Sequence, residues 1–77
     1  MYELNQILDL VAKSGTVEDM ENFDSSKTFR ENGVDSLEVM GLFLAVEEGL
    51  GVKFSEDEAN AINTIDEMLT MLNARST

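Results

Sequence analysis

The chain has 77 residues, enough for a single small domain over residues 1–77 and too few for a two-domain enzyme or one built around a large cavity. Its 16 acidic and 5 basic residues, with no histidine, give a net charge of −11. That charge argues against binding to DNA, RNA or anionic lipid and favours protein partners with basic patches. Since 43% of the residues are hydrophobic, we expect a folded domain and not a disordered acidic tail.

The first predicted helix runs from Tyr2 to about Lys13. Its apolar residues follow the spacing of one face of an amphipathic helix: Leu4, Ile7, Leu8 and Val11. Ser14 and Gly15 then provide a stop signal.

A long, mostly irregular connection is expected over residues 16–34, with a short turn at 17–20. Such a length is unusual in a compact domain, and it frees the flanking helices from forming a tight hairpin. Four apolar side chains are spaced along the connection as anchors for the core: Val17, Met20, Phe23 and Phe29.

The next predicted helix runs from Asp35 to about Leu50. Asp35 is a favourable N-cap residue, and Glu38, three positions later, completes an acidic capping box. Ser36 therefore falls on the first helical residue, where backbone N–H groups lack partners and favour negative charge. Its hydroxyl should be exposed, and a phosphate attached there would lie at a helix N-terminus. The simplest interpretation is that Asp35 and Ser36 only cap the helix.

This helix should present two different faces. Its core face carries Val39, Leu42, Phe43, Val46 and Leu50. The opposite side combines apolar and acidic residues: Leu37, Met40 and Leu44 with Glu47 and Glu48. These apolar residues either pack under the long connection or form a docking strip, to which the acids add electrostatic steering.

Two further helices are predicted, a short one through about Ile62 and a last one to about Ala74. Each begins with a capping box, formed by Ser55 with Glu58 and by Thr64 with Glu67. The sequence therefore predicts an all-α fold, a small four-helix bundle with three longer helices, one short helix and a long first loop.

Intrinsic catalysis is not expected. Ser36 has no histidine to activate it as a nucleophile. Lys53 could serve as the base only if its ammonium group were desolvated. The ligand spacing of an EF-hand is absent, so the acidic clusters are expected to attract divalent ions only loosely. What remains is a hydroxyl presented for another enzyme to modify, beside an acidic and apolar surface.

The chain has no cysteine and therefore no thiol of its own. Neither a signal peptide nor an apolar stretch near the roughly 20 residues of a membrane span is visible. We expect a cytoplasmic, monomeric protein without membrane insertion.

The run Gly33-Val34-Asp35-Ser36-Leu37 resembles the D-S-L attachment motif of acyl carrier proteins, the small four-helix phosphopantetheine carriers. Similar features follow in the same order and spacing: Glu47-Glu48, Gly51-Val52-Lys53-Phe54, Glu56-Asp57-Glu58-Ala59 and Thr64-Ile65. The resemblance covers residues 28–72 and, more weakly, the first helix. D-S-L alone is a weak motif, whereas D-S-L with this spacing, length and acidity is specific.

The resemblance implies that Ser36 receives 4′-phosphopantetheine from coenzyme A through a phosphopantetheinyl transferase, which Asp35 and Leu37 would contact. The thiol of the arm would then carry acyl groups as thioesters for fatty-acid, polyketide or related enzymes, namely acyl-transferring and condensing enzymes with basic docking patches. The residues implied to dock these partners are Glu38, Met40, Leu44, Glu47 and Glu48. An acyl chain would lie between the second and third helices, near Leu42, Val46, Phe54, Ala59 and Ile62.

Two positions depart from the family pattern. Gly41 stands where many members carry an acid, and Ser55 stands where proline is common. These departures leave room for a carrier dedicated to a specialised pathway. The alternatives are a peptidyl or aminoacyl carrier of a nonribosomal pathway, an unmodified acidic helical interaction module, and a divalent-ion sensor.

The charge of −11 predicts that added salt or Mg²⁺ raises the melting temperature, because counter-ions screen self-repulsion in a domain with a thin core. Thermal melts followed by circular dichroism across a range of ionic strengths measure the effect. A melting temperature that stays constant across that range would contradict the prediction.

Overall fold

The predicted helices are all present, with bounds close to those expected. The computed structural model describes residues 1–75, and within them the elements are α1 (Leu4–Ser14), α2 (Ser36–Leu50), α3 (Glu56–Ala61) and α4 (Ile65–Arg75). This part of the chain contains no strand, so the predicted all-α four-helix fold is confirmed. The proposed single domain over residues 1–77 includes two residues, 76 and 77, that lie outside the described part.

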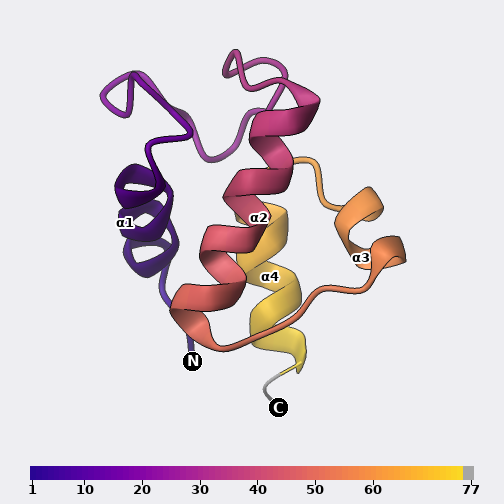
Figure 1. Cartoon of the computed structure of the whole chain (residues 1–77). Coiled ribbons are helices and arrows are strands. Elements are labelled where there is room, and N and C mark those ends of the chain that lie inside the picture. Colours follow the sequence, from indigo (N-terminus) through magenta and orange to yellow (C-terminus); the bar gives the residue numbers. More distant parts are fainter. Residues whose placement is uncertain (76–77) are drawn as a thin grey trace.

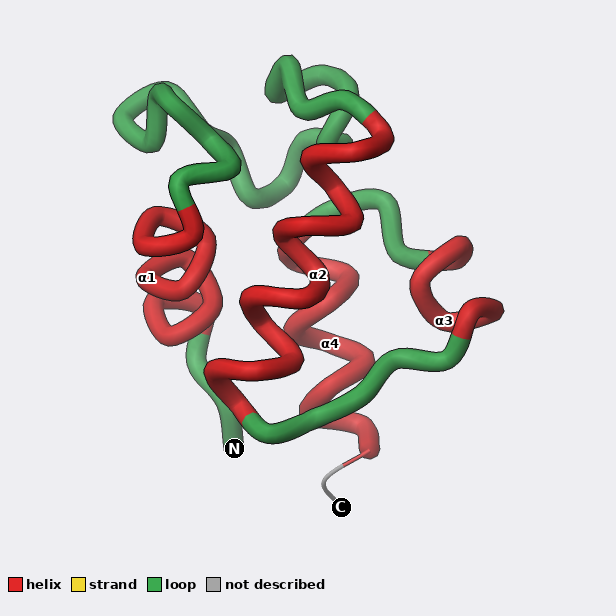
Figure 2. The backbone as a smooth tube through the Cα atoms, viewed as in Figure 1, coloured by secondary structure: helices red, strands yellow, loops and turns green. Residues whose placement is uncertain are grey.

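The three longer helices pack together, and the short α3 lies to one side of them (Figure 1). α1 packs against both α2 and α4. The long first loop crosses one end of the bundle, and the linker from α2 to α3 runs past the opposite end (Figure 2). The domain measures 32 × 23 × 21 Å. No helix within residues 1–75 is long and apolar enough to cross a membrane.

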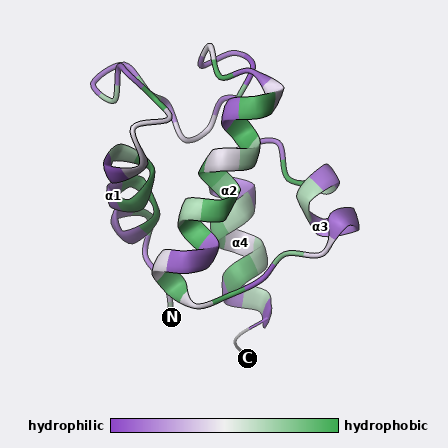
Figure 3. Ribbon diagram, viewed as in Figure 1, coloured by the Kyte–Doolittle hydropathy of each residue, from purple (hydrophilic) through white to green (hydrophobic). Residues whose placement is uncertain are grey.

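The core joins one face of each longer helix to anchors from the loops. Its buried side chains are all apolar: Ile7, Val11, Val17, Phe29, Val34, Leu42, Phe43, Val46, Ile62, Ile65, Met68 and Leu72. Burial of each large aliphatic side chain contributes about 1.5–3 kcal/mol, so this cluster supplies most of the favourable free energy of folding. Of the predicted core face of α2, Val39 and Leu50 are only half-buried. Apolar residues also lie on the outward side of α2 (Figure 3).

The four predicted anchors of the first loop all reach the core. Val17 and Phe29 are buried, while Met20 and Phe23 are half-buried and pack against the core. The first loop is thus a packed layer over one end of the bundle, which explains how so long a connection can be part of a compact domain.

The turn predicted at residues 17–20 is wrong in position. The Phe23 N–H donates to the Met20 carbonyl (3.3 Å), so the turn spans residues 20–23. The Asp19 carboxylate accepts hydrogen bonds from the backbone and side chain of Asn22 (3.3 and 2.7 Å). This local bonding by an Asp side chain favours the later turn.

The last turns of α4 tie distant segments together. The Asn73 amide accepts from the Tyr2 N–H (2.8 Å) and donates to the Tyr2 carbonyl (3.1 Å). Arg75 donates to the Lys53 carbonyl (2.7 Å) and pairs with Glu58 (3.7 Å). The end of α4 therefore holds both the N-terminal segment and the linker that leads into α3.

The Leu10 side chain of α1 packs directly onto Gly49 of α2. A Cβ atom at position 49 would lie 2.6 Å from Leu10 Cδ1, so this half-buried side chain would have to move. Gly41, on the same helix, has space, because the nearest atom to a Cβ there is the Thr16 hydroxyl oxygen at 3.6 Å. The two helical glycines are therefore not equivalent.

Gly41→Ala should raise the free energy of unfolding by about 0.5–1 kcal/mol, because alanine is the better helix former and the site is open. Gly49→Ala should raise it by less, because displacing the Leu10 side chain offsets the better helix propensity of alanine. Urea unfolding of the two variants and of Gly49→Ala/Leu10→Ala measures the difference. Equal stabilisation by both single substitutions would contradict the packing of Leu10 onto Gly49.

Candidate functional site

α2 begins at Ser36 because a reciprocal pair of hydrogen bonds caps it there. The Asp35 carboxylate accepts from the Glu38 N–H (2.9 Å), and the Glu38 carboxylate accepts from the Asp35 N–H (3.1 Å). The first helical bond follows at once, from the Val39 N–H to the Asp35 carbonyl (2.9 Å). The predicted capping box is confirmed, and it places Ser36 on the first residue of the helix.

The Ser36 hydroxyl is exposed and has no hydrogen-bond partner within residues 1–75. In the same part of the chain, the N–H groups of Ser36 and Leu37 also lack acceptors, as expected for the first turn of a helix. Ser55, at the start of α3, differs because its hydroxyl accepts from the Glu58 N–H (3.1 Å). Ser36 therefore offers an uncommitted hydroxyl next to two uncommitted N–H donors.

The loop before Ser36 is organised by the side chain of Asn32. Its amide oxygen accepts from the Asp24 N–H (2.9 Å). Its amide nitrogen donates to the carbonyls of Asp24 (2.9 Å), Thr28 (3.1 Å) and Lys27 (3.3 Å). Gly33 then takes a positive φ of 78°, which glycine adopts at no steric cost. This bonding holds residues 24–33 in one closed loop.

A second pair of hydrogen bonds supports the same loop at Thr28 and Glu31. The Thr28 N–H donates to the Glu31 carboxylate (2.9 Å), and the Glu31 N–H donates to the Thr28 hydroxyl (3.1 Å). The Thr28 N–H, which favours the ionised form, keeps the pKa of Glu31 below its usual value. The ionised carboxylate of Glu31 is therefore one of the acceptors that hold this loop together.

The closed loop is attached to the start of α4. The Phe29 N–H donates to the Asn63 carbonyl (3.0 Å), and the Asp66 N–H donates to the Ser25 carbonyl (3.1 Å). Val34, two residues before Ser36, is buried in the core. The chain therefore passes from the core to the surface immediately before Ser36.

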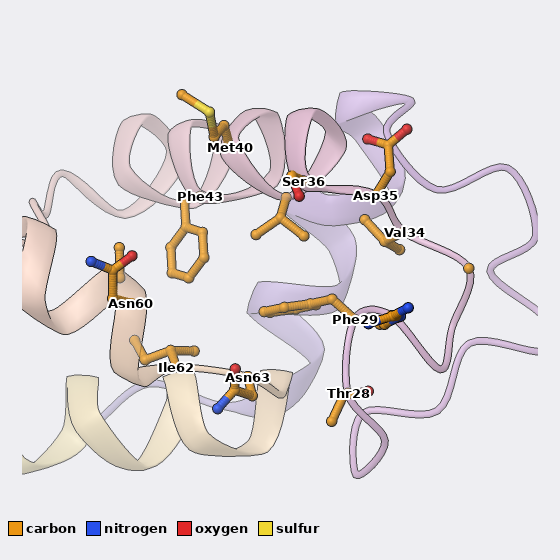
Figure 4. Close-up of a pocket in the computed structure, with 14 residues that line it drawn as sticks. Thr28, Phe29, Val34, Asp35, Ser36, Met40, Phe43, Asn60, Ile62 and Asn63 are labelled. Carbon is orange, nitrogen blue, oxygen red and sulfur yellow. The ribbon is translucent and has the colours of Figure 1, made fainter.

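A groove of about 750 Å³ lies between α2 and α3, with Ser36 at one end. Figure 4 shows Phe43 projecting into it from α2 and Phe29 from the loop. Its apolar lining consists of Phe29, Val34, Val39, Met40, Phe43, Ala59 and Ile62. Its polar lining consists of Thr28, Arg30, Asp35, Ser36, Asn60 and Asn63. Of these lining residues Arg30 alone is cationic. We call this space the α2–α3 groove.

The residues predicted to surround an acyl chain occupy three different places. Ala59 and Ile62 line the α2–α3 groove. Phe54 lines an adjoining hollow of about 410 Å³, which Ala59 also borders. Leu42 and Val46 have no exposed surface and line neither space, because they face the core.

The outward face of α2 carries three large exposed apolar side chains. Leu37, Met40 and Leu44 are 79%, 69% and 55% exposed, and we call them the exposed strip. The interpretation in which they pack under the long loop is therefore wrong. Met40 lies between the strip and the groove, since it lines both the groove and the adjoining hollow.

The three acids predicted to dock partners have different surroundings. Glu38 is held in the capping box, and the half-buried Glu47 accepts from the Phe54 N–H (2.8 Å). Glu48 is exposed and, within residues 1–75, has no hydrogen-bond or ion-pair partner. Of the three acids, Glu48 is therefore the one whose charge is fully available to a partner.

Several groove residues were not identified by sequence reasoning. Thr28 and Arg30 reach the groove from the first loop, and Asn60 and Asn63 reach it from α3 and the following turn. They lie close together where the Phe29–Asn63 and Asp66–Ser25 backbone hydrogen bonds join the first loop to the start of α4. No group of three or more acidic side chains within residues 1–75 is arranged to hold a metal ion.

Comparisons with known proteins agree with this geometry. A family model described as the phosphopantetheine attachment site matches residues 5–72. Acyl carrier protein 3 of Ralstonia nicotianae is 29% identical over 72 residues, which cover 92% of this chain and 82% of that protein. The chloroplastic acyl carrier protein 2 of Hordeum vulgare is 24% identical over 71 residues, which cover 92% of this chain but 55% of that protein. No solved structure matches the chain.

Asn32→Ala should lower the free energy of unfolding by about 1–3 kcal/mol, because partly buried backbone groups lose their only side-chain partner. Urea unfolding measures the loss. Asn22→Ala is the matched control, since Asn22 is exposed and bonds only to Asp19 in its own turn, and we expect it to have a much smaller effect. Similar losses for both variants would show that Asn32 does not organise the loop.

Proposed function

The chain belongs to the phosphopantetheine-attachment family, whose prosthetic group is 4′-phosphopantetheine, and from that premise we propose that it is an acyl carrier protein modified on Ser36. The observation that carries this proposal is the uncommitted Ser36 hydroxyl on the first residue of α2. The other helix-start serine, Ser55, has its hydroxyl engaged in a cap.

The residues around Ser36 fit a phosphodiester. The N–H groups of Ser36 and Leu37 can donate to its oxygens, and the positive end of the helix dipole favours its charge. The nearby carboxylates of Asp35 and Glu38 accept from each other's backbone N–H groups, which offsets part of their repulsion toward a phosphate. When bound, the prosthetic group supplies the thiol that holds acyl groups as thioesters, which this cysteine-free chain lacks.

The chain contributes only the acceptor atom to the attachment reaction. The Ser36 oxygen forms a bond to the pantetheine-bearing phosphorus of coenzyme A, the diphosphate bond breaks, and adenosine bisphosphate leaves. The hydroxyl proton passes to a base on the phosphopantetheinyl transferase, because this chain has no histidine. Asp35 and Leu37 flank the serine and contact the transferase. We assign the catalysis to partner enzymes.

The exposed strip is the surface that partner enzymes contact. Three apolar side chains provide area to bury, and Glu48 beside them provides a free negative charge. The net charge of −11 steers the chain toward acyl-transferring and condensing enzymes with basic patches. Glu38 and Glu47 contribute to the same field while they hold the local structure. We place this monomeric single-domain carrier in the cytoplasm.

A second candidate function is an interaction module that is never modified. The exposed strip favours it, because such a surface would recruit a partner whether or not Ser36 carries a group. A peptidyl or aminoacyl carrier, in contrast, requires the same modification of Ser36. Modification therefore separates the carrier from the module.

Incubation with coenzyme A and a promiscuous phosphopantetheinyl transferase should add the mass of one phosphopantetheine to the chain, measured by intact mass spectrometry. Ser36→Ala should abolish the addition, because it removes the acceptor oxygen. Ser55→Ala, which removes a serine at another helix start, should take up the group as the wild type does. No addition to the wild type, or an addition that survives Ser36→Ala, would exclude the proposed role of Ser36.

A further inference from the structure

Asn32 is the only asparagine of the chain that is followed by glycine. An asparagine in this position loses its side-chain amide readily, because glycine has no Cβ to hinder the approach of its backbone nitrogen. The dipeptide lies in the closed loop, residues 24–33, which leads to Ser36. The least stable amide of the sequence is therefore also the side chain that organises this loop.

Loss of the amide needs only the chain and water. The Gly33 nitrogen gives up its proton to hydroxide and attacks the side-chain carbonyl carbon of Asn32. A bond forms between these two atoms, the bond from that carbon to the amide nitrogen breaks, and ammonia leaves with a proton taken from water. Water then opens the resulting succinimide ring at either of its carbonyl carbons, which gives aspartate or isoaspartate.

The closed loop holds both reacting groups in hydrogen bonds. The Gly33 N–H donates to the Arg30 carbonyl (3.0 Å). The amide nitrogen of Asn32 donates to three backbone carbonyls of the loop, and its oxygen accepts from the Asp24 N–H. The side chain must break these bonds before its carbonyl carbon can turn toward the Gly33 nitrogen. The reaction therefore requires the loop to open first.

Opening of this loop does not require unfolding of the bundle. The loop contains no helix or strand, Asn32 is only half-buried, and Gly33 is exposed. Besides the bonds of Asn32, the reciprocal pair between Thr28 and Glu31 keeps it closed. Surface loops of this kind open with a lower free energy than the core. The rate of amide loss should therefore measure how often the loop opens.

The acidic products cannot rebuild the closed loop. A carboxylate at position 32 has no N–H to donate, so three backbone carbonyls lose their partner. It also adds a negative charge next to Glu31 in a chain that already carries −11. Isoaspartate in addition lengthens the backbone by one carbon, which displaces the hydrogen bonds from the N–H groups of Gly33 and Val34.

We propose that Asn32 is a site of spontaneous deamidation that the closed loop protects, and that the acidic products leave the loop open and impair the modification of Ser36. The first part concerns only the chain and water. The second part rests on the proposed function, because it concerns transfer of phosphopantetheine to Ser36. Val34, whose N–H donates to the Phe29 carbonyl (2.9 Å), links the loop to the start of α2.

The first experiment compares deamidation of the folded and the urea-unfolded chain in mildly alkaline buffer, measured by peptide mass spectrometry. Position 32 should react about tenfold or more slowly in the folded chain, because opening must precede the chemistry. Asn22, which precedes the bulky Phe23, is the internal control and should stay intact in both states. In urea, Gly33→Ala should slow the reaction several-fold, because the added methyl group hinders the attack.

Thr28→Ala should accelerate the reaction in the folded chain but not in urea, because it removes the hydroxyl that accepts the Glu31 N–H. We expect an increase of about threefold or more, the effect of one lost hydrogen bond on the opening equilibrium. Asp19→Ala is the matched control, since it removes the hydrogen bonds of the neighbouring turn and should leave the rate unchanged.

Two outcomes would overturn the protection by the closed loop. The first is an equal rate of deamidation at position 32 in the folded and the unfolded wild type. The second is a folded Thr28→Ala variant that reacts no faster than Asp19→Ala.

Asn32→Asp reproduces one product in an otherwise unchanged chain. Hydrogen exchange at the backbone N–H groups of Asp24 and Gly33 should become about tenfold faster or more, because the bonds that close the loop are lost. The initial rate of phosphopantetheine transfer to Ser36 should fall several-fold. Asn22→Asp is the matched control, since it adds the same charge outside the closed loop.

The results for Asn32→Asp separate the two parts of the proposal. Exchange as slow as in the wild type would overturn the opening of the loop. Transfer at the wild-type rate, or an equal loss in Asn22→Asp, would overturn the effect on Ser36 alone. A wild type that takes up no phosphopantetheine would overturn the proposed function and the second part with it, whereas the deamidation would stand on its own measurement.

Discussion

The whole site depends on where α2 begins. Two carboxylate–backbone hydrogen bonds, between Asp35 and Glu38, fix that start within one residue. Val34 is buried just before it and Ser36 is exposed just after it, so the capping pair lies at the boundary between core and solvent. A start one residue later would put Ser36 in the capping position, with its hydroxyl engaged as that of Ser55 is.

Local signals in the sequence were sufficient to predict the helices. The capping boxes at Asp35, Ser55 and Thr64 are all present, and each opens its helix within one residue of the expected position. These signals work because a cap involves residues only three positions apart, so its geometry hardly depends on the rest of the fold. The turn placed at residues 17–20 failed, because the bonding of Asp19 to Asn22 competes with apolar spacing in that segment.

The walls of the site, in contrast, could not be predicted from sequence. Arg30 and Asn60 are far apart in the chain and line one groove where loop and turn are joined at Phe29 and Asn63. Helical periodicity placed Leu42 and Phe43 on the same core face, and both are buried, yet only Phe43 also lines the groove. The exposed strip was predicted as one of two alternatives, and only the accessible surface of its side chains distinguishes them.

The hydrogen bonds between Asn73 and Tyr2 have a consequence for the orientation of the domain. They hold the first residues beside the last turns of α4, at the end of the bundle opposite to the start of α2 (Figure 1). A tether joined near either of these segments therefore leaves the domain on the side away from Ser36. A domain immobilised through such a tether, on a bead or as a fusion, would present Ser36 and the start of α2 outward to soluble enzymes.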